Sequence, residues 1–432
     1  MKYPILKGTF DILPDQPKKE DQWKETARWQ YVESVMRQLA EDYGYREVRT
    51  PVFEKTELFV RGVGETSDIV TKEMYTFQDK GERSITLRPE GTASVMRAFA
   101  QGQLQQLGSH HKFFYIGPFF RHDRPQAGRF RQFHQFGIEA IGNKEPEQDL
   151  ETIDLLYQLY QRLGLTDLQV MVNTLGEPSC RETYKKELLA YLKPHFDSLS
   201  EESKARFTKN PLRILDSKDP KEKELLQSAP SILDFLSSES EKHFEKLCSL
   251  LKDQGIPFTI APQLVRGLDY YNHTVFEVTS GVLGAQNTIG AGGRYDGLLP
   301  AIGGPDLPCI GFSTGIERIL QTMEGQNAPF PEKKGPFVTF IPLGEEAKKV
   351  ALKHLYGLRH QGVSSALIFA KKIQKALQQA EQSHTTFAII IGEEELAKNK
   401  AQVKAMNLRT SQDIPLDTLV EFLTKERKKD GL

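Results

Sequence analysis

The segment that most constrains this fold is residues 111–142, which the alternation of side chains predicts to be a long antiparallel hairpin. Two strand-like runs, HKFFYIGPFFRH and RQFHQFGIEAIG, flank the loop DRPQAGRF. Successive side chains of a strand point to opposite faces. The second run therefore divides its side chains into an apolar set, Phe136, Ile138 and Ala140, and a polar or aromatic set, Arg131, Phe133, Gln135 and Glu139. We expect one face of the hairpin to be apolar core.

The other face of the hairpin carries side chains suited to a phosphorylated ligand. The first run adds Arg121, with Tyr115 and Phe119 in matching alternation, and the loop adds Arg124 and Arg129. Guanidinium groups match phosphate oxygens, and an aromatic ring beside them can stack on a base. A solvated sheet face whose charges pair among themselves explains the hairpin alone equally well.

The stretch LVRGLDYYNHTVFEV, residues 264–278, runs from polar residues directly into a strand-like sequence. If that strand is buried, Arg266, Tyr270 and Tyr271 need partners, because unpaired buried polar groups are costly. Shortly after it, GAGGRYDGL, residues 290–298, places three glycines before Arg294 and Tyr295. Such a glycine loop lets the backbone approach a ligand closely, although it is more often a simple turn.

Two helix starts carry candidate ligand-binding residues. In LRPEGT, Glu90 and Thr92 lie where a helix begins, a pair that a capping box also explains. In GIERIL, Arg318 follows Gly315 by one helical turn, on a helix that leaves a strand directly. An arginine in that position can reach back to the sheet, and a surface arginine is the simpler alternative.

The length of 432 residues exceeds what one hydrophobic core normally serves, so more than one domain is expected. The sequence predicts an α+β domain on an antiparallel sheet over residues 1–325, with a helical insertion at about 179–256. In YGYREVRTPVFE, Pro51 marks an edge or the end of strand pairing. A linker rich in proline, glycine and lysine follows at 326–336. Alternating strand and helix patterns then predict a small α/β domain over 337–432.

Composition narrows the class of protein. No apolar run reaches the length of a membrane span, and the first residues lack the hydrophobic region of a signal peptide. The three widely spaced cysteines form neither a disulfide framework nor a zinc ligand set, which favours a reducing cytoplasm. Residues 331–432 hold 17 Lys+Arg against 12 Asp+Glu, a net charge of +5, and the rest carries −6. The basic domain could attract a polyanion or simply be solvated.

One motif points to a different chemistry. GFSTG, residues 311–315, fits the nucleophile-elbow pattern G-x-S-x-G at a strand-to-helix junction. A serine hydrolase also needs a histidine later in the chain, and His354, His360 and His384 all lie beyond the linker. Hydrolase chemistry is therefore disfavoured. Neither a Walker A motif nor a G-x-G-x-x-G fingerprint in a βαβ setting is present.

Together these segments resemble the histidyl-tRNA synthetases of bacterial type, which are class II aminoacyl-tRNA synthetases. YIGPFFRHDRPQAGRFRQFHQFGIE resembles the second motif of the class, PCIGFSTGIERIL the third, and YGYREVRTPVFE stands where the dimer-forming first motif belongs. LVRGLDYYNHTVFEV and GAGGRYDGL resemble the two signatures peculiar to the histidine enzymes, and NPLRILDSKD resembles part of their insertion. The likeness spans nearly the whole chain and is weakest in the insertion and the C-terminal domain.

The resemblance implies a ligase that activates histidine with ATP and Mg²⁺ and transfers it to tRNA(His), as a cytoplasmic homodimer without zinc. It implies histidine-binding roles for Glu90, Thr92 and Gln135 at the α-amino group and for Glu139, Tyr270 and Tyr271 around the imidazole. It implies ATP-binding or catalytic roles for Arg121 and Arg318 on the phosphates, Phe133 on adenine and Arg266 at the reacting carboxylate. The remaining implied site residues are the acceptor-end arginines Arg124 and Arg129 and the glycine loop Gly292, Gly293, Arg294 and Tyr295. The C-terminal domain would hold the anticodon.

A non-catalytic relative is the alternative interpretation. The regulatory subunit of ATP phosphoribosyltransferase uses the same fold to sense histidine, typically without the C-terminal domain and with the catalytic arginines lost. In this chain Arg121, Arg266 and Arg318 stand in place and the last 100 or so residues are present, so the catalytic interpretation is favoured.

Overall fold

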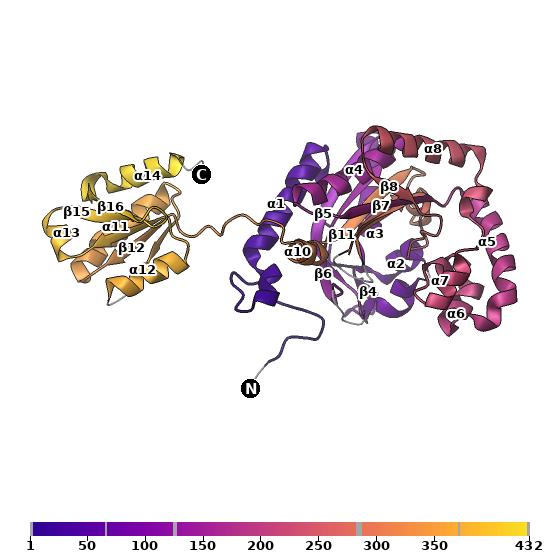
Figure 1. Cartoon of the computed structure of the whole chain (residues 1–432), viewed down its shortest axis with the longest axis horizontal. Coiled ribbons are helices and arrows are strands. Elements are labelled where there is room, and N and C mark those ends of the chain that lie inside the picture. Colours follow the sequence, from indigo (N-terminus) through magenta and orange to yellow (C-terminus); the bar gives the residue numbers. More distant parts are fainter. Residues whose placement is uncertain (1–2, 65–66, 124–127, 282–286, 370–371, 430–432) are drawn as a thin grey trace. The chain divides into compact units, whose positions relative to one another are not determined.

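The computed structural model describes residues 3–64, 67–123, 128–281, 287–369 and 372–429 (Figure 1). The chain forms two compact units, Met1–Phe330 and Pro331–Leu432. Each unit has its own buried apolar cluster built around its own sheet.

The first unit is built on an eight-stranded sheet in the order β1-β5-β6-β11-β10-β9-β7-β8. Neighbours from β5 to β7 are antiparallel, and only the two edge strands join in parallel. The strands, in sheet order, are β1 (Arg46–Glu47), β5 (His111–Phe120), β6 (Gln132–Ile141), β11 (Cys309–Gly315), β10 (Thr288–Arg294), β9 (Asn272–Ser280), β7 (Leu168–Thr174) and β8 (Phe258–Ile260). The predicted hairpin is confirmed as β5 and β6.

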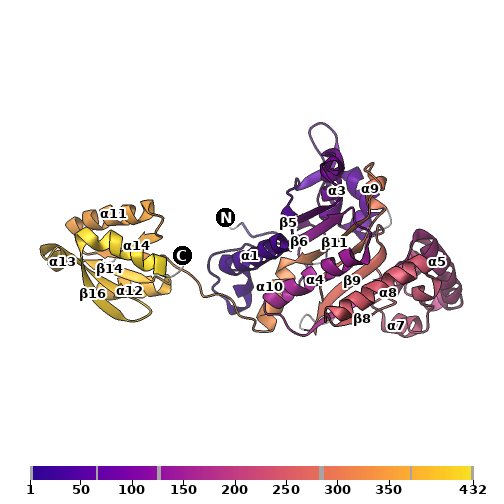
Figure 2. The same cartoon turned by 90° about the horizontal axis from the view of Figure 1, so that it is seen from above.

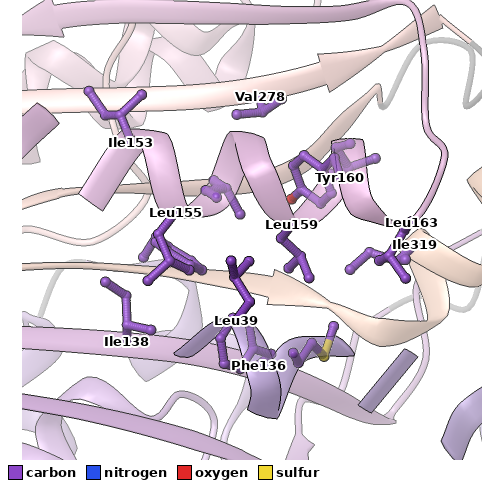
Figure 3. Close-up of a cluster of buried hydrophobic side chains, with 14 of the residues drawn as sticks. Leu39, Phe136, Ile138, Ile153, Leu155, Leu159, Tyr160, Leu163, Val278 and Ile319 are labelled. Atoms are coloured by element: carbon purple, nitrogen blue, oxygen red, sulfur yellow. The ribbon is translucent and has the colours of Figure 1, made fainter. Parts of the chain in front are cut away.

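The helices that cover the apolar face of this sheet include α1 (Thr26–Asp42), α4 (Pro146–Arg162) and α10 (Ile316–Gly325) (Figure 2). Helix α4 begins with a proline at its first turn, and its apolar residues recur at helical spacing. Figure 3 shows Leu155 and Leu159 of α4 above Phe136 and Ile138 of β6. Phe136 and Ile138 are fully buried, as the side-chain alternation of the hairpin predicts.

The opposite face of the sheet is covered at one end by α3 (Thr92–Gln101), whose apolar residues pack with Phe113 and Phe119 of β5. A small sheet of β2 (Phe53–Lys55), β4 (Ser84–Leu87) and β3 (Tyr75–Gln78) lies next to α2 (Thr56–Val63). Around Pro51 the chain passes from the large sheet to the small one, because β1 ends before this proline and β2 begins after it. A short helix, α9 (Leu298–Ala301), follows β10.

Helices occupy the segment between β7 and β8. They are α5 (Pro178–Leu192), α6 (Glu201–Lys209), α7 (Pro220–Leu226) and α8 (Ser238–Asp253), with tight 3₁₀ turns between them at Lys193–Ser198, Pro211–Asp216 and Ile232–Phe235. Side-chain caps begin α6 at Ser200, α7 at Asp219 and α8 at Ser237. Below, this segment is called the insertion.

The second unit has a five-stranded sheet in the order β13-β12-β14-β15-β16. Helices α11 and α14 pack on one apolar cluster and α12 on another. The elements are β12 (Val338–Pro342), α11 (Glu345–His360), β13 (Ser365–Leu367), α12 (Ile373–Gln382), β14 (Phe387–Ile391), α13 (Glu393–Ala397), β15 (Lys400–Ala405), β16 (Thr410–Pro415) and α14 (Leu419–Lys429). The α/β pattern is confirmed, but the sequence analysis missed the antiparallel pair β15–β16.

Candidate active site

A cavity of about 850 Å³ lies on the sheet face that α1, α4 and α10 leave open. It is lined by strands β5, β6, β10 and β11, by the start of α3, by residues 266–271 and by the insertion. The sequence-predicted residues that it brings together are Glu90, Thr92, Arg121, Arg129, Phe133, Gln135, Arg266, Tyr270, Tyr271, Tyr295 and Arg318. Glu139 lies directly behind Tyr295, whose hydroxyl donates a hydrogen bond to Glu139 Oε2.

The cavity has one end rich in buried oxygen atoms, formed around Glu139 and the tyrosines. The rings of Tyr270, Tyr271 and Tyr295 pack together with centroids 4.7, 5.5 and 6.4 Å apart. Burial raises the pKa of the Glu139 carboxyl to about 8, against the hydrogen bond from Tyr295. Glu139 Oε1 and Gln135 Oε1 are buried without a hydrogen-bond partner in the described part of the chain. This end therefore leaves buried polar atoms that a polar ligand would complete.

Glu90 lines this end of the cavity and lies just before helix α3. Its carboxylate accepts hydrogen bonds from the backbone N–H groups of Thr92, at 2.7 Å, and Ala93, at 2.8 Å. Burial raises the pKa of Glu90, and these two N–H groups oppose that shift. The pair does not form a capping box, because the N-cap residue of α3 is Gly91. The Glu90 carboxylate still accepts from the first N–H groups of the helix, and this places a carboxylate and a hydroxyl on the cavity wall.

Three arginines define the other end, and each is held by the protein. Arg121 Nε donates to Pro89 O at 2.8 Å, and its guanidinium lies over the Phe133 ring at 5.3 Å from the centroid. Arg318 Nη1 donates to Thr288 O at 2.7 Å. Arg266 forms an ion pair with Glu277 and lies over the Tyr271 ring. A dense group of oriented cations of this kind fits a polyphosphate.

Glu277 is a residue at this end that sequence reasoning missed. Its Oε1 pairs with Arg266, and its Oε2 accepts a hydrogen bond from Thr288 Oγ1 at 2.9 Å. Since Thr288 also holds Arg318 through its carbonyl, one carboxylate connects the supports of two arginines. The available signal was a lone acidic residue inside the apolar strand TVFEV, eleven positions after an arginine.

The predicted glycine loop is wrong as a loop. Residues 290–294 lie in strand β10, paired on both sides. A Cβ at Gly292 would lie 2.2 Å from Gly311 O, so this glycine permits close packing within the protein. Arg294 is 1% exposed and pairs with Asp149 at 2.5 Å, away from the cavity. Of this segment's four candidates, Tyr295 lines the cavity and Gly292, Gly293 and Arg294 do not.

Of the two arginines predicted to lie in the hairpin loop, the structure describes one. Arg129 lines the cavity and its Nη1 pairs with Asp123 Oδ2 at 2.8 Å. Arg124 lies outside the described residues. Ser313, the serine of the elbow-like motif, is in the middle of strand β11, where Gln135 Nε2 contacts its hydroxyl at 3.4 Å. It stands on no strand-to-helix turn, so the structure gives the nucleophile interpretation no support.

The comparisons with known proteins match both units. The family model of histidyl-tRNA synthetase matches residues 19–319, and that of an anticodon binding domain matches residues 338–426. A histidine–tRNA ligase of Protochlamydia amoebophila is 53% identical over 424 residues, covering 98% of this chain and all of that protein. This chain belongs to the histidyl-tRNA synthetase family.

Further relatives agree with this membership. The histidine–tRNA ligase of Bacillus velezensis is 46% identical, covering 99% of this chain and all of that protein. The crystal structure of apo S. aureus histidyl-tRNA synthetase superposes with a TM-score of 0.82 at 36% identity, covering 98% of this chain and all of that one. A Bacillus halodurans protein described as an ATP phosphoribosyltransferase regulatory subunit/histidyl-tRNA synthetase shares the fold at a TM-score of 0.60 and 19% identity. The regulatory-subunit alternative is not favoured.

In this synthetase the insertion forms part of the cavity wall. Arg213 Nη2 contacts Asp68 Oδ2 at 3.1 Å, and Arg213 Nη1 donates to Gly267 O at 3.0 Å. Asn210 Nδ2 donates to Asp269 Oδ1 at 2.8 Å. The insertion is thereby fastened to the segment that carries Arg266, Tyr270 and Tyr271.

Across the residues that the structure describes, no group of three or more His, Cys, Asp or Glu side chains is placed to hold a metal ion. Within the same residues, every helix is too short or too polar to cross a membrane.

Proposed function

We propose that this chain is a histidine–tRNA ligase, which activates L-histidine with ATP and then transfers it to the 3′ end of tRNA(His). One observation carries the proposal: a single cavity joins the oxygen-rich end around Glu139 to the end that holds Arg121, Arg266 and Arg318. An imidazole and an ammonium group suit the first end, since both offer N–H donors. A triphosphate suits the second.

The amino-acid substrate occupies the end around Glu139. Glu90, Thr92 and Gln135 bind the α-ammonium group, and Glu139, Tyr270 and Tyr271 surround the imidazole. The buried acceptor atoms of Gln135 and Glu139 support this assignment, because they lack partners until a donor arrives.

ATP occupies the arginine-rich end, with its adenine on Phe133 and its phosphates between Arg121 and Arg318. A histidine carboxylate oxygen attacks the α-phosphorus, the bond to the bridging oxygen breaks, and pyrophosphate leaves with the electron pair. The reaction needs no protein nucleophile, only alignment and dispersal of negative charge. Arg266 supplies that charge at the carboxylate and α-phosphate. Mg²⁺ bound with ATP would neutralise part of the phosphate charge, and Glu277, whose carboxylate lies beside Arg266, would be the residue to hold it.

In the second step the 3′-terminal ribose hydroxyl of tRNA(His) attacks the carbonyl of histidyl-adenylate and AMP leaves. Arg129, with Arg124 of the same loop, meets the acceptor end. The second unit binds the anticodon. Its net charge of +5, against −6 for the rest of the chain, supports this division of roles.

The enzyme works as a homodimer in the cytoplasm. Exposed apolar side chains on and beside the small sheet, Val52, Phe53 and Phe77, support an interface there. Cys180, Cys248 and Cys309 are all free thiols, which suits a reducing compartment. Light scattering of the full chain should give the mass of two copies, and Phe53→Glu should shift it towards one.

Histidine-dependent exchange of pyrophosphate into ATP tests the catalytic proposal. The purified chain should catalyse this exchange with histidine and without tRNA. A protein that binds histidine but exchanges no pyrophosphate would instead be a sensor of the regulatory kind.

A further inference from the structure

Both tryptophans of the chain lie in one aromatic cluster beside the hairpin. The rings of Trp23 and Trp29 pack on Phe10 with centroids 4.9 and 6.0 Å away. Phe130 packs on the same ring at 4.8 Å. Trp29 Nε1 donates to Trp23 O at 2.9 Å, and both tryptophans are buried. Below, Phe10, Trp23, Trp29 and Phe130 are called the tryptophan cluster.

Phe10 belongs to an N-terminal segment that contacts the hairpin at two points. The backbone N–H of Arg131 donates to Gly8 O at 2.7 Å, next to the contact between Phe10 and Phe130. The side chains before Gly8 contribute little burial, because Tyr3 and Leu6 are 87% and 77% exposed. The contacts of this part of the segment are therefore concentrated where the chain enters β6.

Phe130 connects the tryptophan cluster to the arginine-rich end of the cavity. It lines the cavity together with its neighbour Arg129. A Cβ at Gly128 would lie 3.6 Å from Arg318 Cγ, so this stretch of chain passes directly beside Arg318. Burial lowers the pKa of Arg318, and the nearby charge of Arg129 lowers it further. Because two like charges repel, the protein has to hold both guanidinium groups in place, and the packing of Phe130 fixes the backbone that carries Arg129.

A second route leads from the tryptophan cluster to Arg318. The ring of Trp29 packs edge-on against that of His134, with centroids 5.0 Å apart. The backbone N–H of His134 donates to Glu317 at 2.8 Å, and His134 Nδ1 lies 3.0 Å from the same carboxylate. Glu317 directly precedes Arg318 at the start of α10. The cluster therefore contacts the supports of both Arg129 and Arg318.

We propose that Phe10 is a positioning residue for ATP, which acts through Phe130 and Trp29 on the arginine-rich end of the cavity. Phe10 itself does not line the cavity. The inference rests on the proposed function, since it concerns how the ATP site of that reaction is held. The oxygen-rich end is held by different contacts, such as the hydrogen bond from Tyr295 to Glu139. Loss of the Phe10 ring should therefore weaken the productive binding of ATP and leave that of histidine unchanged.

Phe10→Ala tests the inference in pyrophosphate exchange. The KM for ATP should rise by about tenfold, because aromatic contacts are lost and the arginines are misplaced, whereas the KM for histidine should change by less than about twofold. Phe10→Tyr keeps the ring and should restore the KM for ATP. An unchanged KM for ATP in Phe10→Ala overturns the inference, as does a Phe10→Tyr variant that is as impaired as Phe10→Ala.

Tryptophan fluorescence gives a second readout, since both tryptophans of the chain lie in the cluster. Phe10→Ala should move the emission to longer wavelength, because removal of the ring opens Trp23 and Trp29 to water. Phe10→Tyr should emit like the wild type. A KM for ATP that rises without any change in emission would mean that the effect does not pass through the cluster, against the inference.

Phe330→Ala is the matched control. Phe330 is also a partly buried aromatic residue packed against the first core, but its ring contacts Tyr31 at 6.1 Å and Arg28 at 4.5 Å. The KM of this variant for ATP should equal that of the wild type. An equal rise in Phe10→Ala and Phe330→Ala would show that any loosening of the core weakens ATP binding, and the specific role of Phe10 would be refuted.

Equilibrium dialysis of ATP separates the failure of this inference from the failure of the proposed function. Phe10→Ala should bind ATP about tenfold more weakly than the wild type, whether or not pyrophosphate is exchanged. Equal affinities in the two proteins would overturn the inference and leave the proposed function standing. A wild-type protein that exchanges no pyrophosphate with histidine would overturn the proposed function itself.

Discussion

The oxygen-rich end of the cavity and its arginine-rich end recognise ligands in different ways. Around Glu139, buried acceptors wait without partners in the empty protein. Around Arg266 and Arg318, each guanidinium is already held by a protein carboxylate or carbonyl. The first end can reject a ligand because an incorrect one leaves buried atoms unpaired. The second accepts any correctly placed polyphosphate, since its cations are oriented in advance and act through charge.

The largest effect should appear at the oxygen-rich end of the wild-type enzyme. Sites that hydrogen-bond a polar side chain can reject analogues without those groups by about 10⁴–10⁵. Pyrophosphate exchange with phenylalanine, leucine or glutamine should therefore be undetectable under conditions where histidine is rapid. Ready pyrophosphate exchange with phenylalanine would show that the oxygen-rich end does not discriminate between amino-acid side chains.

The next effect belongs to the arginine-rich end. Arg266→Ala should fold normally and lose about 10²–10³ in the rate of histidine activation, since the guanidinium acts on charge that develops in the transition state. Histidine binding should weaken less. Arg83→Ala is the control, because Arg83 is a surface residue paired with Asp79. Near-wild-type exchange by a folded Arg266→Ala would remove this residue from the mechanism.

Changes to the imidazole contacts should affect one substrate only. Glu139→Gln and Tyr271→Phe should raise the KM for histidine by about tenfold to a hundredfold and leave the KM for ATP nearly unchanged. Steady-state exchange with each substrate varied in turn provides the measurement. If the KM for ATP rose equally, the two ends would not be independent.

The pKa of Glu139 predicts a smaller effect, on stability. Its folded value of about 8 lies above the ordinary 4.5, so the folded protein holds this proton more tightly than the unfolded chain does. The contribution favours folding below pH 4.5 and is lost as pH rises towards 8. Glu139→Gln, which stays neutral, should therefore gain in melting temperature relative to the wild type, by on the order of a few degrees at pH 8. Unfolding curves at pH 5 and pH 8 that differ equally for both proteins would contradict the raised pKa.

Removing the second unit should have the smallest effect on activation. Ala328 and Phe330 pack against the first core and Phe330 lies beneath Arg28, so the cut belongs after Pro331. The shortened protein should exchange pyrophosphate at close to the full rate. It should bind tRNA more weakly and with a shallower dependence on salt, because phosphate contacts are lost. Loss of exchange would mean that the second unit supports the catalytic fold, and unchanged charging would mean that it does not bind tRNA.

The sequence predicted those features of the fold that depend on local periodicity, such as the two faces of a strand. Phe136 and Ile138 alternate with Gln135 and Glu139, so the two faces of β6 followed from the pleat alone. What depends on contacts between distant segments was not predicted. Glu277 lies at the site because it accepts from Thr288, eleven residues later, whose carbonyl holds Arg318, and no spacing rule contains these contacts. In the second unit, KAQVKA contains a single β-branched residue, Val403, so β15 was missed.

The prediction that the glycine segment forms a ligand-binding loop was wrong for a related reason. Three glycines before Arg294 and Tyr295 suggested backbone near a ligand, yet the close approach at Gly292 is between β10 and β11. Glycine shows that something comes close, and the sequence does not say whether it is a ligand or another strand. Arg294 was misassigned with it, because its partner Asp149 lies on α4, far away in the chain.

The ring of Tyr115 on β5 packs against Gly91, just before α3, and Gly137, on β6, and this packing limits how the chain can diverge. A methyl group at either glycine would overlap the tyrosine ring. The order of substitutions at these positions is therefore constrained. A larger residue at either glycine is tolerated only after Tyr115 has been replaced by a smaller residue. Shrinking it first empties the centre of the amino-acid end. The three positions therefore constrain one another, although they lie in separate stretches of sequence.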